Sequence, residues 1–213
     1  MKLLTSLIIF STSLVSLNLP ANIQDIIAVA RIQKTALLSA ENYVEQGEIY
    51  QKQEKHDLAL IQYNKAIQVN PNSSTAYYSR GLLYYMQEKY ESSLADFNKV
   101  IHINSNHAGA YGNRGNAYLY LGKEKLALKD YDRAIKLEPN LARGYFNRGY
   151  VYSLQGRKKL AMADFQKAKD LFMKKGDKIN AKKANDHIKS FPAINVLKRN
   201  IIIFLLRIKS LII

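Results

Sequence analysis

Small and aromatic residues recur at helical spacing along most of the chain, and the whole pattern repeats every 34 residues. Glycine stands at Gly47, Gly81, Gly115 and Gly149, and tyrosine at Tyr43, Tyr77, Tyr111 and Tyr145. Further series in the same register are Tyr50, Tyr84, Tyr118 and Tyr152, and Ala59, Ser93, Ala127 and Ala161. A period of this length over four copies indicates a tandem-repeat architecture.

Each copy predicts two helices. Tyr43, Gly47 and Tyr50 are spaced i, i+4, i+7, so they share one face of a first helix. The same spacing runs from Ala59 to Ala66 and predicts a second helix, with a polar turn between the two. Small residues on the facing sides let the two helices approach closely, and the aromatic rings fill the flanking space. A proline ends the first and third copies, because proline lacks an amide proton and clashes with the preceding helical turn.

The pattern of glycine, alanine, aromatic residues and proline resembles the tetratricopeptide repeat family. The resemblance covers residues 40–73, 74–107, 108–141 and 142–175, and the large residue that opens each repeat is tyrosine here. It implies an all-α fold in which antiparallel helix pairs stack into a right-handed superhelical solenoid. One pair cannot bury its own apolar face, so at least three are needed for stability, and four suffice.

Residues 176–191 are expected to form a capping helix on the last repeat. Ile179, Ala184, Ile188 and Phe191 fall on roughly one face, and lysines occupy the other. A solenoid needs a polar-backed end of this kind to stay soluble.

The N-terminal segment, residues 1–30, begins with Lys2 before a short apolar stretch, which is the form of a secretory signal peptide. We expect its removal, by a cut after Ala21 or after Ala30, and an uncleaved N-terminal anchor is the alternative. Either outcome places the body of the protein outside the cytoplasm, in the periplasm, a lumen or the extracellular space. Residues 31–39 are expected to be a linker or a lead-in to the first helix.

The C-terminal segment, residues 192–213, is a basic and apolar tail. Residues 201–206 are all apolar, and Lys198, Arg199, Arg207 and Lys209 flank them. Six apolar residues are too few to span a bilayer as a helix. Their basic flanks suit a segment that lies at the surface of an anionic membrane, and a disordered or locally docked tail is the alternative.

Composition excludes several kinds of chemistry. The chain has no cysteine, which excludes a disulfide framework, thiolate metal sites and cysteine nucleophiles. The four histidines show no metal-ligand spacing. Asp130 and Asp132 stand two apart on a helix, so they point in different directions and are expected on the solvated surface rather than in a catalytic pair. We therefore expect no enzyme, no cofactor, no metal and no small-molecule substrate.

Charge is unevenly distributed. The net charge is +15, and residues 157–213 hold 15 Lys and Arg against 4 Asp and Glu. A basic end suggests an anionic surface nearby, although the lysine-rich capping helix accounts for part of it. The near-neutral body argues against nucleic acid as the partner.

In the tetratricopeptide repeat family, which this chain resembles, the first helix of each repeat lines the concave side of the solenoid. The resemblance therefore implies a partner-binding groove. Carried over residue by residue, its main members are Glu45, Glu48, Tyr78, Leu82, Tyr85, Asn113, Asn116, Tyr120, Arg143, Phe146, Asn147 and Tyr150. The further groove positions are Glu41, Val44, Gln51, Lys52, Thr75, Ser79, Met86, Gly109, Gly112, Leu119, Ser153 and Leu154. The aromatic members fall outside the packing series, which favours exposed anchors for a ligand. The asparagines can pair with an extended peptide backbone, and the glutamates favour a basic stretch of ligand.

One subset of the family binds the C-terminal carboxylates of chaperones through a clamp of lysine, asparagine and arginine. The corresponding positions here are Tyr78 and Leu82, then Asn113, then Arg143 and Asn147. Two cationic positions and one asparagine are missing, so we expect no chaperone-tail binding.

The sequence therefore predicts a non-enzymatic interaction scaffold that holds an extended peptide or a helix of a protein partner in its concave groove. The alternative is a membrane-associated assembly factor for a multisubunit complex, tethered by its N-terminus or by the basic tail. The partner and the oligomeric state stay open.

Overall fold

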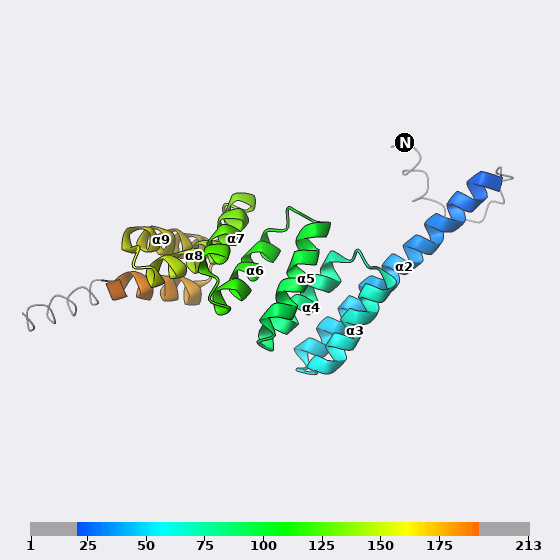
Figure 1. Cartoon of the computed structure of the whole chain (residues 1–213), viewed down its shortest axis with the longest axis horizontal. Coiled ribbons are helices and arrows are strands. Elements are labelled where there is room, and N and C mark those ends of the chain that lie inside the picture. The colour runs from blue at the N-terminus through cyan, green and yellow to red at the C-terminus, as the bar shows by residue number, and fades with distance from the viewer. Residues whose placement is uncertain (1–20, 192–213) are drawn as a thin grey trace, which may run out of the picture.

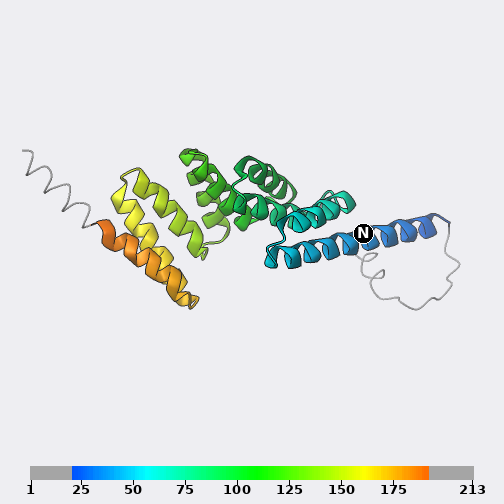
Figure 2. The same ribbon diagram turned by 90° about the horizontal axis from the view of Figure 1, so that it is seen from below.

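The computed structural model describes residues 21–191, and all regular elements within that range are α-helices. The helices are α2 (Ala21–Lys52), α3 (His56–Val69), α4 (Ser74–Met86), α5 (Tyr90–Ile103), α6 (Ala108–Tyr120), α7 (Glu124–Leu137), α8 (Ala142–Leu154), α9 (Lys158–Lys174) and a last helix over residues 178–191. Consecutive helices pack as antiparallel pairs, and the pairs follow one another in a single elongated array (Figures 1 and 2). The predicted all-α solenoid is confirmed.

The core of each pair is built from the repeated positions. Tyr63, Phe97, Tyr131 and Phe165 on the second helices are fully buried, and each faces the glycine of its own first helix. A Cβ atom on Gly115 would lie 2.7 Å from Cε1 of Tyr131, which is closer than side chains tolerate. Glycine is therefore required there for the two helix axes to approach this closely.

The turn inside each pair passes through one residue in the left-handed region. Its φ angle is 59° at Glu54, 60° at Glu88, 69° at Gly122 and 70° at Gly156. Only glycine adopts this conformation without steric cost, so the first two repeats carry strain that the last two avoid.

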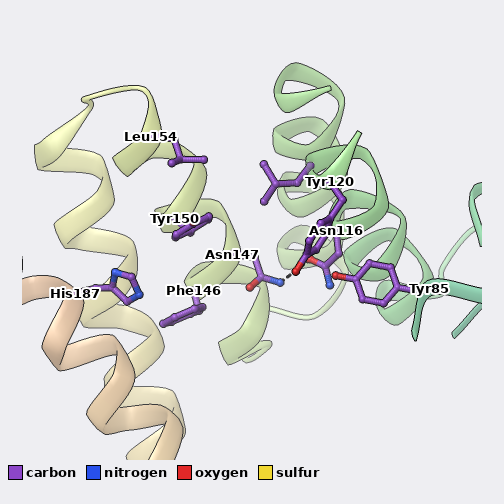
Figure 3. Close-up of a pocket in the computed structure, with 9 residues that line it drawn as sticks. Tyr85, Asn116, Tyr120, Phe146, Asn147, Tyr150, Leu154 and His187 are labelled. Atoms are coloured by element: carbon purple, nitrogen blue, oxygen red, sulfur yellow. Dashed lines mark hydrogen bonds between the residues drawn. The ribbon is translucent and has the colours of Figure 1, made fainter. Parts of the chain in front are cut away.

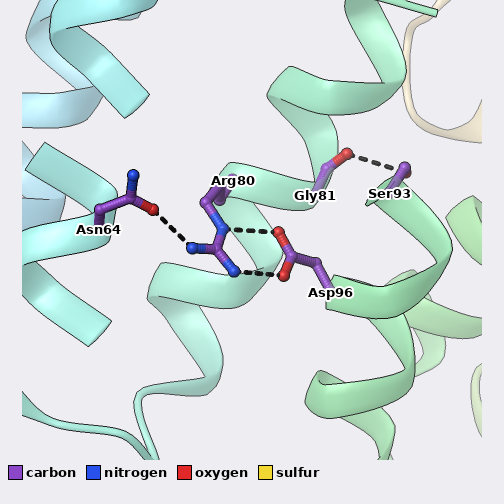
Figure 4. A network of polar contacts seen from close by, with 5 residues as sticks. All are labelled: Asn64, Arg80, Gly81, Ser93 and Asp96. Carbon is purple, nitrogen blue, oxygen red and sulfur yellow. Dashed lines mark hydrogen bonds and ion pairs between the residues drawn. The ribbon is translucent and has the colours of Figure 1, made fainter. Parts of the chain in front are cut away.

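A ladder of buried ion pairs joins the repeats (Figure 4). Arg80 donates from Nε and Nη2 to both carboxylate oxygens of Asp96, at 2.8 and 2.7 Å, and from Nη1 to Asn64 in the preceding repeat, at 2.6 Å. Ser93 donates to the carbonyl oxygen of Gly81 in the same network, at 2.9 Å. Each arginine thus ties together the two helices of its own repeat and the second helix of the repeat before it.

The same ladder recurs twice at the 34-residue period. Arg114 pairs with Asp130 and bonds to Asn98, and Arg148 pairs with Asp164 and with Asp132. The expectation that Asp130 and Asp132 both lie on the solvated surface is wrong for Asp130, whose side chain is only 5% exposed. It is correct for Asp132, which is 56% exposed.

Helix α2 is longer than the first helices of the other repeats, and its N-terminal half extends beyond the end of α3 (Figure 2). Residues 31–39, which were expected to be a linker or a lead-in to the first helix, lie inside α2, as do residues 21–30 of the N-terminal segment. None of the helices between residues 21 and 191 combines the length and the apolar character that a membrane crossing needs. The apolar stretch before residue 21 and the tail after residue 191 lie outside the described residues.

The last helix covers the open end of the fourth repeat. Ala181 and Ala184 pack against Ala168, Leu171 and Phe172 in one cluster. Ile179, which was expected on the buried face, is 73% exposed. The helix begins at residue 178, and a register in which Ala181 and Ala184 face α9 turns Ile179 toward solvent.

Candidate functional site

The candidate site is a pocket of about 520 Å³ among the later repeats and the last helix (Figure 3). It lies between α4, α6, α8 and the last helix. Its lining residues are Tyr85, Asn116, Leu119, Tyr120, Phe146, Asn147, Tyr150, Leu154 and His187. The lining is aromatic, aliphatic and amide in character, and it contains no carboxylate, lysine or arginine side chain.

One wall of the pocket is a cluster of three tyrosines. Tyr120 stacks on Tyr90 with ring centroids 4.9 Å apart and an angle of 13° between the planes. Tyr85 meets both rings edge-on, at 5.6 Å from Tyr90 and 5.7 Å from Tyr120. Burial raises the pKa of Tyr85, and the neighbouring Tyr120 raises it further, so its hydroxyl stays protonated at any physiological pH. Tyr120 itself is 64% exposed, which leaves much of its ring available to a ligand.

The opposite wall depends on the last helix. His187 stacks on Phe165 at 4.8 Å and 14°, and Phe146 meets Phe165 edge-on at 5.4 Å. Tyr150 lies 6.0 Å from the ring of His187 and is 39% exposed. This wall would be incomplete without residues 178–191, so the capping helix is part of the site as well as the end of the solenoid.

The floor between the walls is an amide pair. Asn116 Oδ1 accepts a hydrogen bond from Asn147 Nδ2 at 2.7 Å (Figure 3). It accepts a second one from Tyr131 Oη at 2.8 Å. These contacts fix both side chains. The other polar atoms of the two side chains are a donor, the amide group of Asn116, and an acceptor, the carbonyl oxygen of Asn147.

The structure brings half of the twelve predicted groove residues into this one pocket. They are Tyr85, Asn116, Tyr120, Phe146, Asn147 and Tyr150, and the further positions Leu119 and Leu154 also line it. Glu45 and Glu48 are exposed on α2, outside the pocket, and Arg143 is exposed at the start of α8. Leu82 is half-buried on α4.

Tyr78 and Asn113 form a separate contact nearby. Asn113 Nδ2 donates to Tyr78 Oη at 2.8 Å, and the Tyr78 ring packs on His107 at 4.7 Å and on Phe97 at 5.9 Å. Tyr78 and Phe146 therefore also pack against core rings, contrary to the expectation that packing does not explain the groove aromatics. Of the three asparagines, Asn113 and Asn147 each donate one amide hydrogen within the protein.

No pattern in the sequence pointed to His187. Its place in the pocket follows from how the last helix docks, and that helix falls after the period of 34 has ended. In the described part of the chain, no group of three His, Asp or Glu side chains is placed to hold a metal ion.

Three family models match the chain. A model described as TPR repeat matches residues 47–88 and 115–156, and models described as tetratricopeptide repeat match residues 74–107 and 142–172. No curated protein is significantly similar in sequence.

Several solved structures share the fold. The first TPR of Spaghetti (RPAP3), bound to the HSP90 peptide SRMEEVD, is 28% identical over 56% of this chain and 95% of that one, with a TM-score of 0.55. MamA is 22% identical over 75% of this chain and 99% of that one, with a TM-score of 0.60. YrrB, described as a TPR protein with an unusual peptide-binding site, is 22% identical over 68% of this chain and 81% of that one, with a TM-score of 0.53.

Proposed function

Because the chain belongs to the tetratricopeptide repeat family, we propose that it is a protein-interaction adaptor that holds a peptide or helix of a partner on its concave face. The observation that carries this proposal is the aromatic pocket shared by α4, α6, α8 and the last helix. Exposed aromatic rings that converge on a hollow are typical anchoring points for a partner. Two of the similar structures carry descriptions that mention a peptide or a peptide-binding site, which supports the same class of ligand.

Binding would rest on two kinds of contact. Apolar side chains of the partner would be desolvated against Tyr120, Tyr150 and Leu154, which are 64%, 39% and 55% exposed. The fixed amide of Asn116 and the carbonyl of Asn147 would pair with one peptide unit of the partner, since each offers the complement of a backbone C=O or N–H. Because internal hydrogen bonds already hold both side chains in place, little side-chain entropy is lost on binding.

The chemistry of the groove argues against an acidic ligand such as the HSP90 peptide. Arg143 is the only cation among the twelve groove residues, and Glu45 and Glu48 are both exposed on α2. A ligand with a carboxylate-rich end would meet repulsion there and only one positive charge elsewhere. We therefore propose a neutral or basic partner segment with apolar anchors.

The test is capture of partners by crosslinking in the native host, followed by quantitative mass spectrometry. A Tyr120→Ala/Tyr150→Ala variant removes two exposed pocket rings, and a Leu126→Ala/Leu160→Ala variant removes two leucines that are 44% and 42% exposed outside the pocket. We expect specific neighbours to be lost from the first variant and kept by the second. Equal capture by both variants would contradict the proposal.

A membrane-associated assembly factor is a second candidate, and the exposed lysines at positions 178, 182, 183 and 189 of the last helix favour it. Flotation with anionic vesicles, compared between the full chain and a chain that ends at residue 191, measures how much the tail contributes to membrane binding. We also propose that the protein is exported from the cytoplasm. The first residue of the protein recovered from the host tests whether the N-terminal segment is removed.

A further inference from the structure

The C-terminal tail begins beside the pocket. His187 lines the pocket, and Phe191, four residues later, packs against Phe165 with ring centroids 6.3 Å apart. Phe165 is the ring on which His187 stacks. Four helical residues advance about 6 Å along the helix axis, so the described chain ends at Phe191, about one turn from the pocket wall.

The length of the tail matches this position. Nine residues lie between residue 191 and the apolar run at residues 201–206, so the run begins ten residues along the chain from Phe191. An extended chain of ten residues reaches up to about 33 Å, which is several times the separation of neighbouring packed helices. The apolar run can therefore reach every part of the pocket without any change in the helices.

The chemistry of the tail is complementary to that of the pocket. The run at residues 201–206 is Ile-Ile-Ile-Phe-Leu-Leu, and the pocket exposes Tyr120, Tyr150 and Leu154 in one neutral hollow. The tail contains no acidic residue. A carboxylate stands at the rim of the pocket, where Glu124 Oε2 accepts a hydrogen bond at 2.9 Å from Gln155, the neighbour of Leu154. The basic residues that flank the apolar run can pair with it.

From these observations we propose that residues 201–206 dock into the pocket of the same chain and compete with the partner for it. The proposal rests on the proposed function in one respect, namely that the partner uses the same pocket. A short tether gives the tail an effective concentration of about 1 mM. If the tail binds the pocket with an intrinsic dissociation constant of about 0.1 mM, the docked state is then about ten times more populated than the undocked state. The docked tail would weaken partner binding about tenfold.

The composition of the chain allows a direct test, because it contains no tryptophan. In a Phe204→Trp protein the only tryptophan reports on the tail. We expect its emission to lie at the short wavelengths of a buried indole. Leu154→Asp in the pocket should shift it to the wavelength of exposed tryptophan, whereas Leu160→Asp, on an exposed leucine outside the pocket, should leave it unchanged. Melting of both variants by circular dichroism checks that each is folded.

Disulfide trapping gives an independent readout, since the chain contains no cysteine either. Under mild oxidation, Leu154→Cys with Ile203→Cys should form an intramolecular disulfide at least tenfold faster than Leu160→Cys with Ile203→Cys. Equal rates would overturn the proposal, as would an emission spectrum that does not distinguish Leu154→Asp from Leu160→Asp. An emission shift that arises only after phosphatidylcholine–phosphatidylglycerol vesicles are added would also overturn it, and would assign the tail to a membrane surface.

Failure of this proposal is distinguishable from failure of the proposed function. If the tail docks and the partner uses the pocket, Phe204→Asp should raise partner capture up to about tenfold. If the tail does not dock, Phe204→Asp leaves capture unchanged, while Tyr120→Ala/Tyr150→Ala still lowers it. If the partner binds elsewhere, the pocket variant leaves capture unchanged, while the tryptophan of the tail still responds to Leu154→Asp.

Discussion

Two aspartates on α7 allow the contribution of a buried ion pair to stability to be compared with that of an exposed one. Asp130 is 5% exposed and accepts hydrogen bonds from Arg114 Nε and Nη2, both at 2.7 Å. Asp132 is 56% exposed and accepts one at 2.7 Å from Arg148. The two side chains are chemically identical and two residues apart, so Asp130→Ala and Asp132→Ala form a matched pair.

The expected magnitudes follow from burial. Removing one partner of a buried pair leaves the other charge uncompensated and costs 3–5 kcal/mol in typical cases. Asp130→Ala should cost about 3 kcal/mol, at the lower end, because Arg114 stays 18% exposed and keeps its hydrogen bond to Asn98. Asp132→Ala should cost less than about 1 kcal/mol, because exposed pairs contribute little and Arg148 keeps Asp164.

The assay is urea unfolding followed by far-ultraviolet circular dichroism, with the m-value used to check that each variant exposes the same surface on unfolding. A double variant, Arg114→Met/Asp130→Ala, should cost less than the sum of its single changes, by about 2 kcal/mol, because it leaves no buried charge. Equal costs for Asp130→Ala and Asp132→Ala would refute the reasoning, and so would strict additivity in the double variant.

Three further outcomes are expected. Glu88→Gly should raise the melting temperature and Gly122→Ala should lower it, each by the equivalent of about 1 kcal/mol, because both positions have positive φ; shifts of the same sign would contradict this. Burial, and then the charge of Glu48, raise the pKa of Tyr63 to about 12, so its contribution to stability is complete below pH 10 and is lost as the pH rises toward 12. Tyr63→Phe should therefore flatten the fall of the urea midpoint in that window. Hydrogen bonds from the side chain and backbone of Asn180 lower the pKa of Asp177, so its contribution is present above about pH 3.8 and is lost as the pH falls below that value. The protection of the amides in residues 178–191 against hydrogen exchange, measured relative to the intrinsic exchange rate at each pH, should fall below about pH 3.8. Asp177→Ala should abolish that pH dependence of the protection.

The fold could be predicted from the sequence because each repeat specifies its own packing. Gly115 and Tyr131 illustrate this, since the ring occupies the space that the missing side chain leaves. Such a contact lies within 16 residues of sequence and is copied at every period. The same period also contained the ion-pair ladder, because Arg80, Arg114 and Arg148 recur at 34, as do their aspartates. Asp130 and Asp132 are two residues apart but belong to two different series of that period, and their proximity in sequence hides the ladder.

The site was less predictable, because it depends on contacts that do not repeat. Asn113 and Asn116 occupy neighbouring helical turns, yet Asn113 bonds to Tyr78 and Asn116 accepts from Tyr131 and Asn147. Those choices depend on the residues of adjacent repeats. His187 lies beyond the reach of the period, because α9 has 17 residues where α7 has 14, and the register changes before the last helix.

The constant spacing of the repeats also gives the proposed groove a direction. The residue after each core glycine is turned by about 100° around the helix, away from the packed ring. These residues are Glu48, Leu82, Asn116 and Tyr150, and they differ in every repeat. These four positions therefore change from a glutamate on α2 to a tyrosine on α8, while the packing beneath them stays constant.

A partner bound along this groove should place a basic stretch over α2 and its apolar anchors over α6 and α8. Glu45→Lys/Glu48→Lys reverses the charge of the acidic end without touching the pocket, because both side chains are exposed. Capture should fall, and its dependence on salt should weaken, since the attraction at that end is electrostatic. Capture that is unchanged, or that loses none of its salt dependence, would show that the acidic end does not contact the partner.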